Sequence, residues 1–132
     1  MNKVFALSDA VLIGLHSVVL IASNKEQLNA DLIASRLNAS RHHVAKVLQR
    51  LVKGGLLTSH RGPSGGFSLS KKPQDISLYD IYVCIEGEIE ETPCLMDIPV
   101  CPHHKCLMGK FGSKVTQDFI KYLKENTVKD YL

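Results

Sequence analysis

The fold is decided by residues 40–70, SRHHVAKVLQRLVKGGLLTSHRGPSGGFSLS, where a helical pattern gives way to a strand pattern at a glycine pair. Over residues 41–53 the apolar side chains recur every three or four positions, which predicts one buried helix face: Val44, Val47, Leu48 and Leu51. Ser40 is a suitable N-cap for this helix, and Gly54 and Gly55 end it. The segments LLTSH and FSLS on either side of RGPSGG then predict a two-stranded hairpin.

Two further helices are expected before this stretch. Residues 29–37, NADLIASRL, predict a short helix with Asn29 as its N-cap and three inward side chains: Leu32, Ile33 and Leu37. Residues 3–22 predict a longer amphipathic helix from the apolar spacing of Val4, Leu7, Val11, Leu15 and Val18. Helix, helix-turn-helix and hairpin, in this order, are the elements of a winged helix-turn-helix.

Two more helices are expected after the hairpin. Residues 77–87, SLYDIYVCIEG, combine a Ser77–Asp80 capping box with an inward apolar set of Leu78, Ile81 and Ile85. A last helix is expected from about Gly109 to Glu125, with an apolar stripe of Phe111, Val115, Phe119 and Tyr122. The expected fold class is therefore mainly α with a small β-hairpin wing, a winged helix-turn-helix followed by a long C-terminal helix.

Size and composition predict a single globular domain. The chain has 132 residues, of which 45% are hydrophobic and 22% charged, enough for one core. It lacks the basic start and cleavage site of a secretory signal, and it lacks an apolar run of about eighteen residues. We therefore expect a cytoplasmic protein with four reduced cysteines, and clustered thiols in that setting more often bind metal than form disulfides.

Charge is sharply segregated along the chain, although the net charge is only +3. From Arg36 to Lys72 there are eight Lys or Arg and no acidic residue, whereas from Pro73 to His104 there are seven acidic residues and no Lys or Arg. A basic segment that coincides with a helix-turn-helix and its wing is typical of a nucleic-acid-binding protein. The alternative interpretation is that the polar helix face is merely solvated and that the Gly- and Pro-rich turn is an ordinary hairpin turn.

The predicted architecture assigns DNA contacts to two elements. The second helix of a helix-turn-helix enters the major groove with its first turn at the base edges, where Ser, His and Lys side chains can form hydrogen bonds. A Lys side chain can also act as a point charge on phosphate. An arginine in the wing suits the negative potential of a narrow minor groove. The residues that we assign to DNA binding are Ser40, Arg41, His42, His43, Lys46 and Arg50 on the helix, and Arg61, Pro63, Ser64 and Gly65 in the wing.

A cluster of thiols distinguishes the second half of the chain. Residues 92–106, TPCLMDIPVCPHHKC, place Cys94, Cys101 and Cys106 within thirteen residues, at gaps of six and four. This loop, the stretch HRGPSGGFSLSKKPQDISLYDIYVCIEG before it and the ending NTVKDYL resemble the IscR/NsrR family of winged-helix bacterial transcription regulators over nearly the full length. Members usually space the middle cysteine evenly, so the gaps depart slightly from the family pattern.

The resemblance implies a homodimer that pairs through the C-terminal helix and binds a partly palindromic, double-stranded DNA operator. It implies one iron–sulfur cluster per subunit, with two or four irons, and Cys94, Cys101 and Cys106 as its ligands. Arg61 would be the minor-groove arginine, and Ser40, His43 and Lys46 would occupy recognition-helix positions. Residues 1–75 would then form the DNA-binding domain, with the first helix also in the dimer interface, and residues 76–132 the linker helix, cluster loop and dimerisation helix, in a single compact unit.

Three cysteines leave one cluster position for a different ligand, since such clusters usually have four protein ligands. The nitric-oxide-sensing branch of the family has a ligating aspartate near the N-terminus, donated across the dimer, and Asp9 falls at that place. His103 or His104 in the loop is an alternative, whereas Cys84 has the position of a core residue. The IscR-like branch has a histidine soon after its last cysteine, and the segment CLMGKF contains none.

The expected function is a sequence-specific transcriptional regulator, a repressor, that senses nitric oxide, redox state or iron through the cluster. Alternatives are a structural zinc site of the Cys₃His type and a cluster-free repressor regulated by its thiols or by a protein partner. An enzyme is not expected, because the sequence contains no CxxC, no phosphate-binding Gly loop and no HExxH motif.

Overall fold

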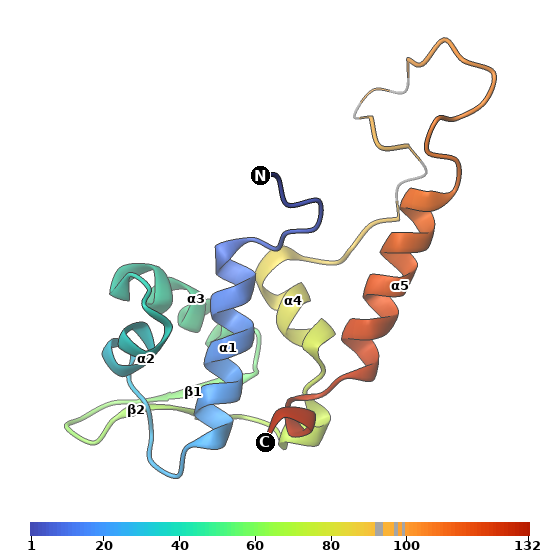
Figure 1. Cartoon of the computed structure of the whole chain (residues 1–132). Coiled ribbons are helices and arrows are strands. Elements are labelled where there is room, and N and C mark those ends of the chain that lie inside the picture. Colours follow the sequence, from blue (N-terminus) through green and yellow to red (C-terminus); the bar gives the residue numbers. More distant parts are fainter. Residues whose placement is uncertain (92–93, 97, 99) are drawn as a thin grey trace.

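The computed structural model describes residues 1–91, 94–96, 98 and 100–132. Figure 1 shows a body of helices from which residues 100–110 project at the N-terminal end of the last long helix. The elements, in chain order, are α1 (Asp9–Ser23), α2 (Ala30–Leu37), α3 (Arg41–Lys53), β1 (Leu57–His60), β2 (Gly66–Leu69), η1 (Pro73–Asp75), α4 (Leu78–Glu86), α5 (Phe111–Glu125) and η2 (Val128–Tyr131). This order confirms the expected fold class.

Local capping signals set the bounds of the helix-turn-helix. Asn29 Oδ1 accepts a hydrogen bond from the Leu32 amide at 2.9 Å and begins α2. Ser40 Oγ accepts from the His43 amide at 3.4 Å and begins α3. Between the two helices Asn38 has a left-handed φ of 51°, and its amide donates to carbonyls in the last turn of α2. The two predicted N-caps are therefore confirmed.

The wing is an antiparallel hairpin anchored at its base. β1 pairs with β2 in the register Leu57↔Leu69 to His60↔Gly66. Phe67 also forms a bridge with Leu28, and its amide donates to the Leu28 carbonyl at 3.0 Å. The base of the hairpin is thus tied to the segment between α1 and α2.

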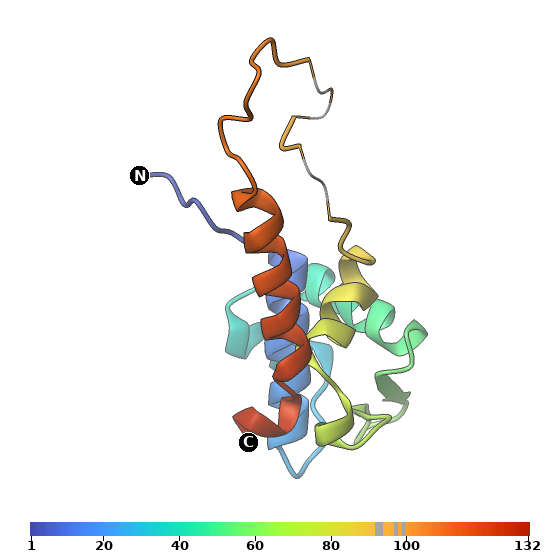
Figure 2. The same cartoon turned by 90° about the vertical axis from the view of Figure 1, so that its right-hand side faces the viewer.

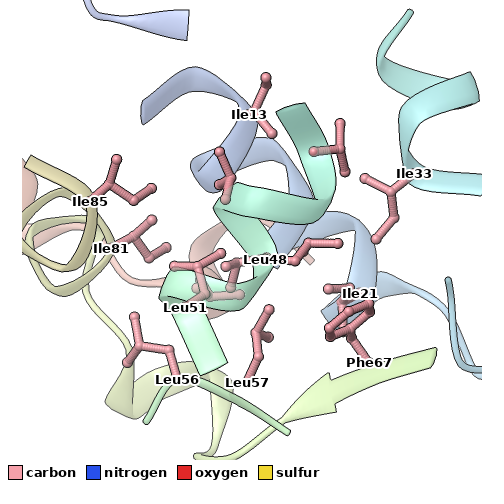
Figure 3. Packing of buried hydrophobic residues seen from close by; sticks show 14 of the residues in the cluster. Ile13, Ile21, Ile33, Leu48, Leu51, Leu56, Leu57, Phe67, Ile81 and Ile85 are labelled. Carbon is pink, nitrogen blue, oxygen red and sulfur yellow. The ribbon is translucent and has the colours of Figure 1, made fainter. Parts of the chain in front are cut away.

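The core lies where α1, α3 and α4 meet, and Figure 3 shows its isoleucine, leucine and phenylalanine side chains packing around α3. All four apolar residues predicted for the inner face of α3 are buried. A glycine lets α1 approach α4, because a Cβ on Gly14 would lie 2.2 Å from Ile85 Cδ1. The structure thereby holds α3 between two other helices.

The first helix begins six residues later than the apolar spacing predicts. Ser8 is extended, with φ −64° and ψ 153°, and its side chain accepts from the Val11 amide, so it caps a helix that begins at Asp9. Val4 precedes the cap and is 99% exposed. The prediction was wrong because the apolar spacing extends to residues before Ser8, whereas the N-cap at Ser8 begins the helix.

The burial expected for Leu32 was wrong, and the start of α5 differs by two residues from the approximate one expected. Leu32 is 47% exposed instead of buried, whereas Ile33 on the same short helix is fully buried. Gly109 has a left-handed φ of 57°, which glycine adopts readily, and α5 begins at Phe111 rather than at Gly109. The capping box of Ser77 and Asp80 at the start of α4 is confirmed, with N–H···O distances of 2.9 and 3.0 Å.

The C-terminus folds back beside the segment that precedes α4. The Val128 amide donates to the Ile76 carbonyl and the Leu78 amide donates to the Asn126 carbonyl, both at 2.9 Å. Figure 2 shows α5 in front of α1, and α5 packs against α4. Most of the predicted apolar stripe of α5 nevertheless remains exposed in the single chain, at Phe111, Val115 and Tyr122. Within the described residues, no helix is long and apolar enough to cross a membrane.

We expect Ser17→Ala to stabilise the fold. Ser17 is fully buried in α1, and its hydroxyl has no hydrogen-bond partner within the part of the chain that the structure describes. An unpaired buried hydroxyl costs about 1–3 kcal/mol, and alanine is the better helix former. Urea unfolding should show a free energy of unfolding that rises by about 0.5–1 kcal/mol.

Ser23→Ala is the matched control for Ser17→Ala. The Ser23 hydroxyl is exposed and donates to the Val19 carbonyl at 2.6 Å, so its removal should change the free energy of unfolding by less than about 0.5 kcal/mol. Destabilisation by Ser17→Ala would mean that this hydroxyl has a partner in solution.

Candidate nucleic-acid interface and cysteine pocket

The first turn of α3 exposes the side chains that the sequence assigns to the major groove. Ser40, Arg41, His42 and Lys46 are exposed, and His43 is half-buried. The Arg41 guanidinium pairs with the Asp31 carboxylate of α2, but both side chains are about two-thirds exposed, so the pair is weak and exchangeable. The start of α3 therefore offers hydrogen-bonding and cationic groups on one surface.

Arg50 is placed differently from the other basic residues of α3. Its Nη1 donates to the carbonyl of Ile85 at 2.9 Å, near the end of α4. One nitrogen of the guanidinium is therefore bonded within the protein, while the residue as a whole is exposed. The sequence does not reveal this contact, because the two residues are 35 positions apart.

The wing turn exposes Arg61, Pro63 and Ser64, and in Figure 1 it extends on the same side of the molecule as α2. Gly62 has φ 107° and its carbonyl accepts from the Gly65 amide at 2.9 Å, which closes the turn. A Cβ on Gly65 would lie 2.4 Å from the His60 carbonyl oxygen. Glycine is required at this position, and Arg61 lies directly after β1, at the start of the turn.

The structure brings the three loop cysteines together around one pocket of about 150 Å³. Its walls are apolar, and two Cys-Leu-Met segments, residues 94–96 and 106–108, supply most of them. Gly109 and Gly112 complete the lining at the start of α5, where a Cβ on Gly112 would be 3.1 Å from Leu95 Cδ2. Sequence reasoning missed these walls, although the repeated Cys-Leu-Met was a visible signal.

The donor set suits a cluster better than a single ion. Among the described residues, no three His, Cys, Asp or Glu side chains are arranged to hold one metal ion. The three thiols nevertheless line the same pocket. An iron–sulfur cluster distributes its thiolate ligands over several irons, so its ligands stand farther apart than those of one ion. Three thiols around one pocket match the type of ligand that an iron–sulfur cluster takes.

The candidates for the fourth ligand lie outside this pocket within one chain. Asp9 lines a separate groove of about 580 Å³ between α1 and the helix-turn-helix, together with His16, Arg36, Ser40 and His43. His103 and His104 are exposed and do not belong to the described lining of the cysteine pocket. Asp9 is thus near the recognition helix rather than near the cysteines of its own chain.

Cys84 is separated from the other thiols and lies half-buried between α3 and α4. Its Sγ donates to the Arg50 carbonyl at 3.2 Å. Burial raises the pKa of the Cys84 thiol above its ordinary value, and the contact with the Gly54 backbone and the Arg50 charge oppose this rise only in part. The prediction that Cys84 is a structural residue agrees with this place.

We expect the cysteines to differ in reactivity in the cluster-free protein. The thiolate is the nucleophile, so the raised pKa and partial burial of Cys84 should slow its alkylation. With iodoacetamide at about pH 8, the exposed Cys101 and Cys106 should react at least about tenfold faster than Cys84, as followed by mass spectrometry. In urea the difference should vanish. Equal rates in the folded protein would contradict the placement of Cys84.

Comparison with known proteins agrees with this geometry. The family model that matches the chain is Rrf2, described as an iron-dependent transcriptional regulator, and the match spans residues 7–132. A protein of Aquifex aeolicus (strain VF5), provisionally named an HTH-type transcriptional regulator, is 33% identical over 135 residues, which cover 95% of this chain and 90% of that protein. The HTH-type transcriptional regulator NsrR of Geobacillus kaustophilus (strain HTA426) is 29% identical over 114 residues, covering 82% of this chain and 75% of NsrR.

Solved structures share the fold. CymR (YrzC), the global cysteine regulator of B. subtilis, matches with a TM-score of 0.79 and 23% identity over 96% of this chain and 95% of CymR. T. potens IscR matches with a TM-score of 0.76 and 23% identity over 96% of this chain and 85% of IscR. The relatives are transcriptional regulators and not enzymes, as expected. The match over residues 7–132 and the 33% identical relative establish that this chain belongs to the Rrf2 family of helix-turn-helix transcriptional regulators.

Proposed function

We propose that the protein is a homodimeric repressor that senses nitric oxide, redox state or iron through an iron–sulfur cluster held by Cys94, Cys101 and Cys106. The observation that carries the proposal is the single pocket that these three thiols line. The iron-dependent description of the family and the likeness to NsrR support it. When bound, the cluster supplies a centre that small oxidants and nitric oxide attack.

DNA recognition is assigned to the first half of the chain, residues 1–75. Ser40, Arg41, His42, His43 and Lys46 present the major-groove surface, because α3 carries them at its exposed start. In the wing, Pro63, Ser64 and Gly65 shape the turn that holds Arg61 toward the minor groove. A regulator of this kind acts on DNA in the cytoplasm, and a partly palindromic operator matches a two-fold symmetric dimer.

The second half of the chain, residues 76–132, is assigned to sensing and pairing. Regulators of this family are typically dimeric. A groove of about 400 Å³ between α1 and α5 is lined mainly by apolar and aromatic side chains, among them Phe5, Phe119 and Tyr122. The exposed apolar stripe of α5 continues this surface. Burial of such a surface favours association, and a second copy of the chain is its proposed occupant.

Asp9 is the proposed fourth ligand, donated by the partner subunit. Within one chain it lines a groove apart from the cysteine pocket, so a ligand role fits a donation between subunits better than one within a subunit. The same groove contains Ser40 and His43 of the recognition helix. Ligation there would connect the cysteine loop of one subunit to the DNA-reading surface of the other. His103 and His104 are the alternatives.

A second candidate is a cluster-free repressor regulated by its thiols or by a protein partner. Cys101 and Cys106 are exposed free thiols, which favours direct oxidation. The likeness in fold to CymR, described as a global cysteine regulator, is compatible with this candidate.

Anaerobic purification separates the two candidates. Four quantities should be measured before and after exposure to nitric oxide: iron content, acid-labile sulfide content, visible absorption, and affinity for a duplex selected from a random pool. The proposal expects brown protein that contains iron and sulfide, and whose absorption and DNA affinity change on exposure. Colourless, iron-free protein that binds the duplex equally well would favour the cluster-free candidate.

A further inference from the structure

Two reciprocal contacts join the recognition helix to α4. Arg50 Nη1 donates to the carbonyl of Ile85 at 2.9 Å, and Cys84 Sγ donates to the carbonyl of Arg50 at 3.2 Å. The same Arg50 carbonyl also accepts from the Gly54 amide at 2.9 Å. We call Arg50, Gly54, Cys84 and Ile85 the α3–α4 junction. Each helix thus gives a side-chain donor to a carbonyl of the other.

Charge and packing at the junction fix how α3 and α4 meet. The last carbonyls of a helix lack partners within the helix and carry partial negative charge, so a guanidinium at Ile85 near the end of α4 is favourable. On the other side, a Cβ on Gly54 would lie 2.1 Å from Cys84 Sγ. The two helices therefore meet with no space for a side chain at Gly54, and α3 has little freedom to slide along α4.

α4 is in turn fixed to α1 close to the junction. Ile85 Cδ1 packs against Gly14, and the Ser8 hydroxyl donates to Glu86 Oε1 at 2.5 Å. The angle at which α3 presents its first turn is consequently set by contacts at its other end, through α4 and α1. Glu86 also ends α4, and the chain passes from there toward the cysteine loop.

We infer that Arg50 is a positioning residue for DNA recognition, which acts through Ile85 rather than by touching DNA. This inference goes beyond the sensing function, because it concerns how the DNA-reading helix is held whether or not a cluster is present. Arg50 lies in the last turn of α3, as Lys53 does, away from the start that reads base edges.

Salt dependence distinguishes positioning from phosphate contact. A residue that contacts phosphate displaces a counterion, so its loss lowers the slope of log affinity against log salt by about 0.9. A positioning residue leaves this slope unchanged but lowers affinity for the specific site, because the reading helix no longer fits it. Binding to a random duplex, which depends mainly on charge, should then be nearly unaffected.

The test compares Arg50→Met with Lys46→Met on two duplexes, one selected by the wild-type protein from a random pool and one of random sequence, over about 50–200 mM salt. Arg50→Met should lose about tenfold in affinity for the selected duplex, the order of one lost base contact, with the slope unchanged. Lys46→Met, with its exposed cation, should lower the slope by about 0.9 and weaken binding to both duplexes.

Cys84→Ala provides a second, uncharged test of the same junction. It removes the other reciprocal contact, and alanine fits the helix, so it should lower the ratio of selected to random affinity with the slope unchanged. Circular dichroism checks that each variant is folded. A slope loss of about 0.9 in Arg50→Met, an equal weakening on both duplexes, or wild-type affinity would overturn the inference.

Discussion

Replacing Cys101 with alanine is expected to remove iron and sulfide from the protein. Its operator affinity should then equal that of cluster-free wild type, which differs by about a hundredfold from the affinity of the cluster-loaded protein. Cys101 lies between the two Cys-Leu-Met segments and lines the shared pocket, so its loss leaves two thiols in this pocket. The affinity change follows if the loaded and cluster-free forms differ by about 3 kcal/mol in their fit to the operator. Anaerobic metal analysis and operator binding on the same preparation measure both effects.

Cys84→Ser is the control for the iron content of Cys101→Ala. Cys84 lies in the α3–α4 junction rather than in the described lining of the cysteine pocket, so this variant should retain iron and sulfide. Two results would count against cluster control of DNA binding. One is Cys101→Ala with wild-type iron content, and the other is an iron-free variant whose operator affinity equals that of loaded wild type.

Features that depend on neighbouring residues could be predicted from the sequence. Asn29, Ser40 and Ser77 each accept a hydrogen bond from the amide three positions ahead. The start of α2, α3 and α4 is therefore determined by a few neighbouring residues. The wing was predictable for the same reason, because Gly62 and Gly65 close its turn locally. The gathering of the cysteines into one pocket was implied by the family resemblance.

Features set by tertiary contacts could not be predicted. The separation of Asp9 from the cysteine pocket depends on how α1 and α5 are arranged in space, and no short-range pattern contains it. The Arg50–Ile85 bond couples residues 35 positions apart in the sequence, so no local pattern contains it. Leu32 fits the apolar spacing of α2 but faces outward, because the short helix buries only a narrow face containing Ile33 and Ala34.

Leu48→Ala is expected to lower the free energy of unfolding by about 3 kcal/mol. Leu48 is fully buried on the inner face of α3, and Figure 3 shows it near the centre of the packed core. Truncation removes apolar contacts and leaves a cavity that the surrounding helices fill only in part, so both terms destabilise the fold. Urea unfolding at one fixed protein concentration measures the loss, since a dimer's stability depends on concentration.

Leu32→Ala makes the same chemical change at a position that is 47% exposed, and it should cost less than about 0.5 kcal/mol because little apolar surface returns to water and alanine favours the helix. The difference in unfolding free energy between the two variants therefore measures the contribution of burial at Leu48, separately from the replacement of a leucine by alanine. Because α3 carries the residues proposed to read DNA on its exposed face, Leu48→Ala should also lose operator binding at lower urea concentrations than Leu32→Ala. Equal unfolding free energies for the two variants would mean that α3 is not held by the core in the way that its buried face indicates.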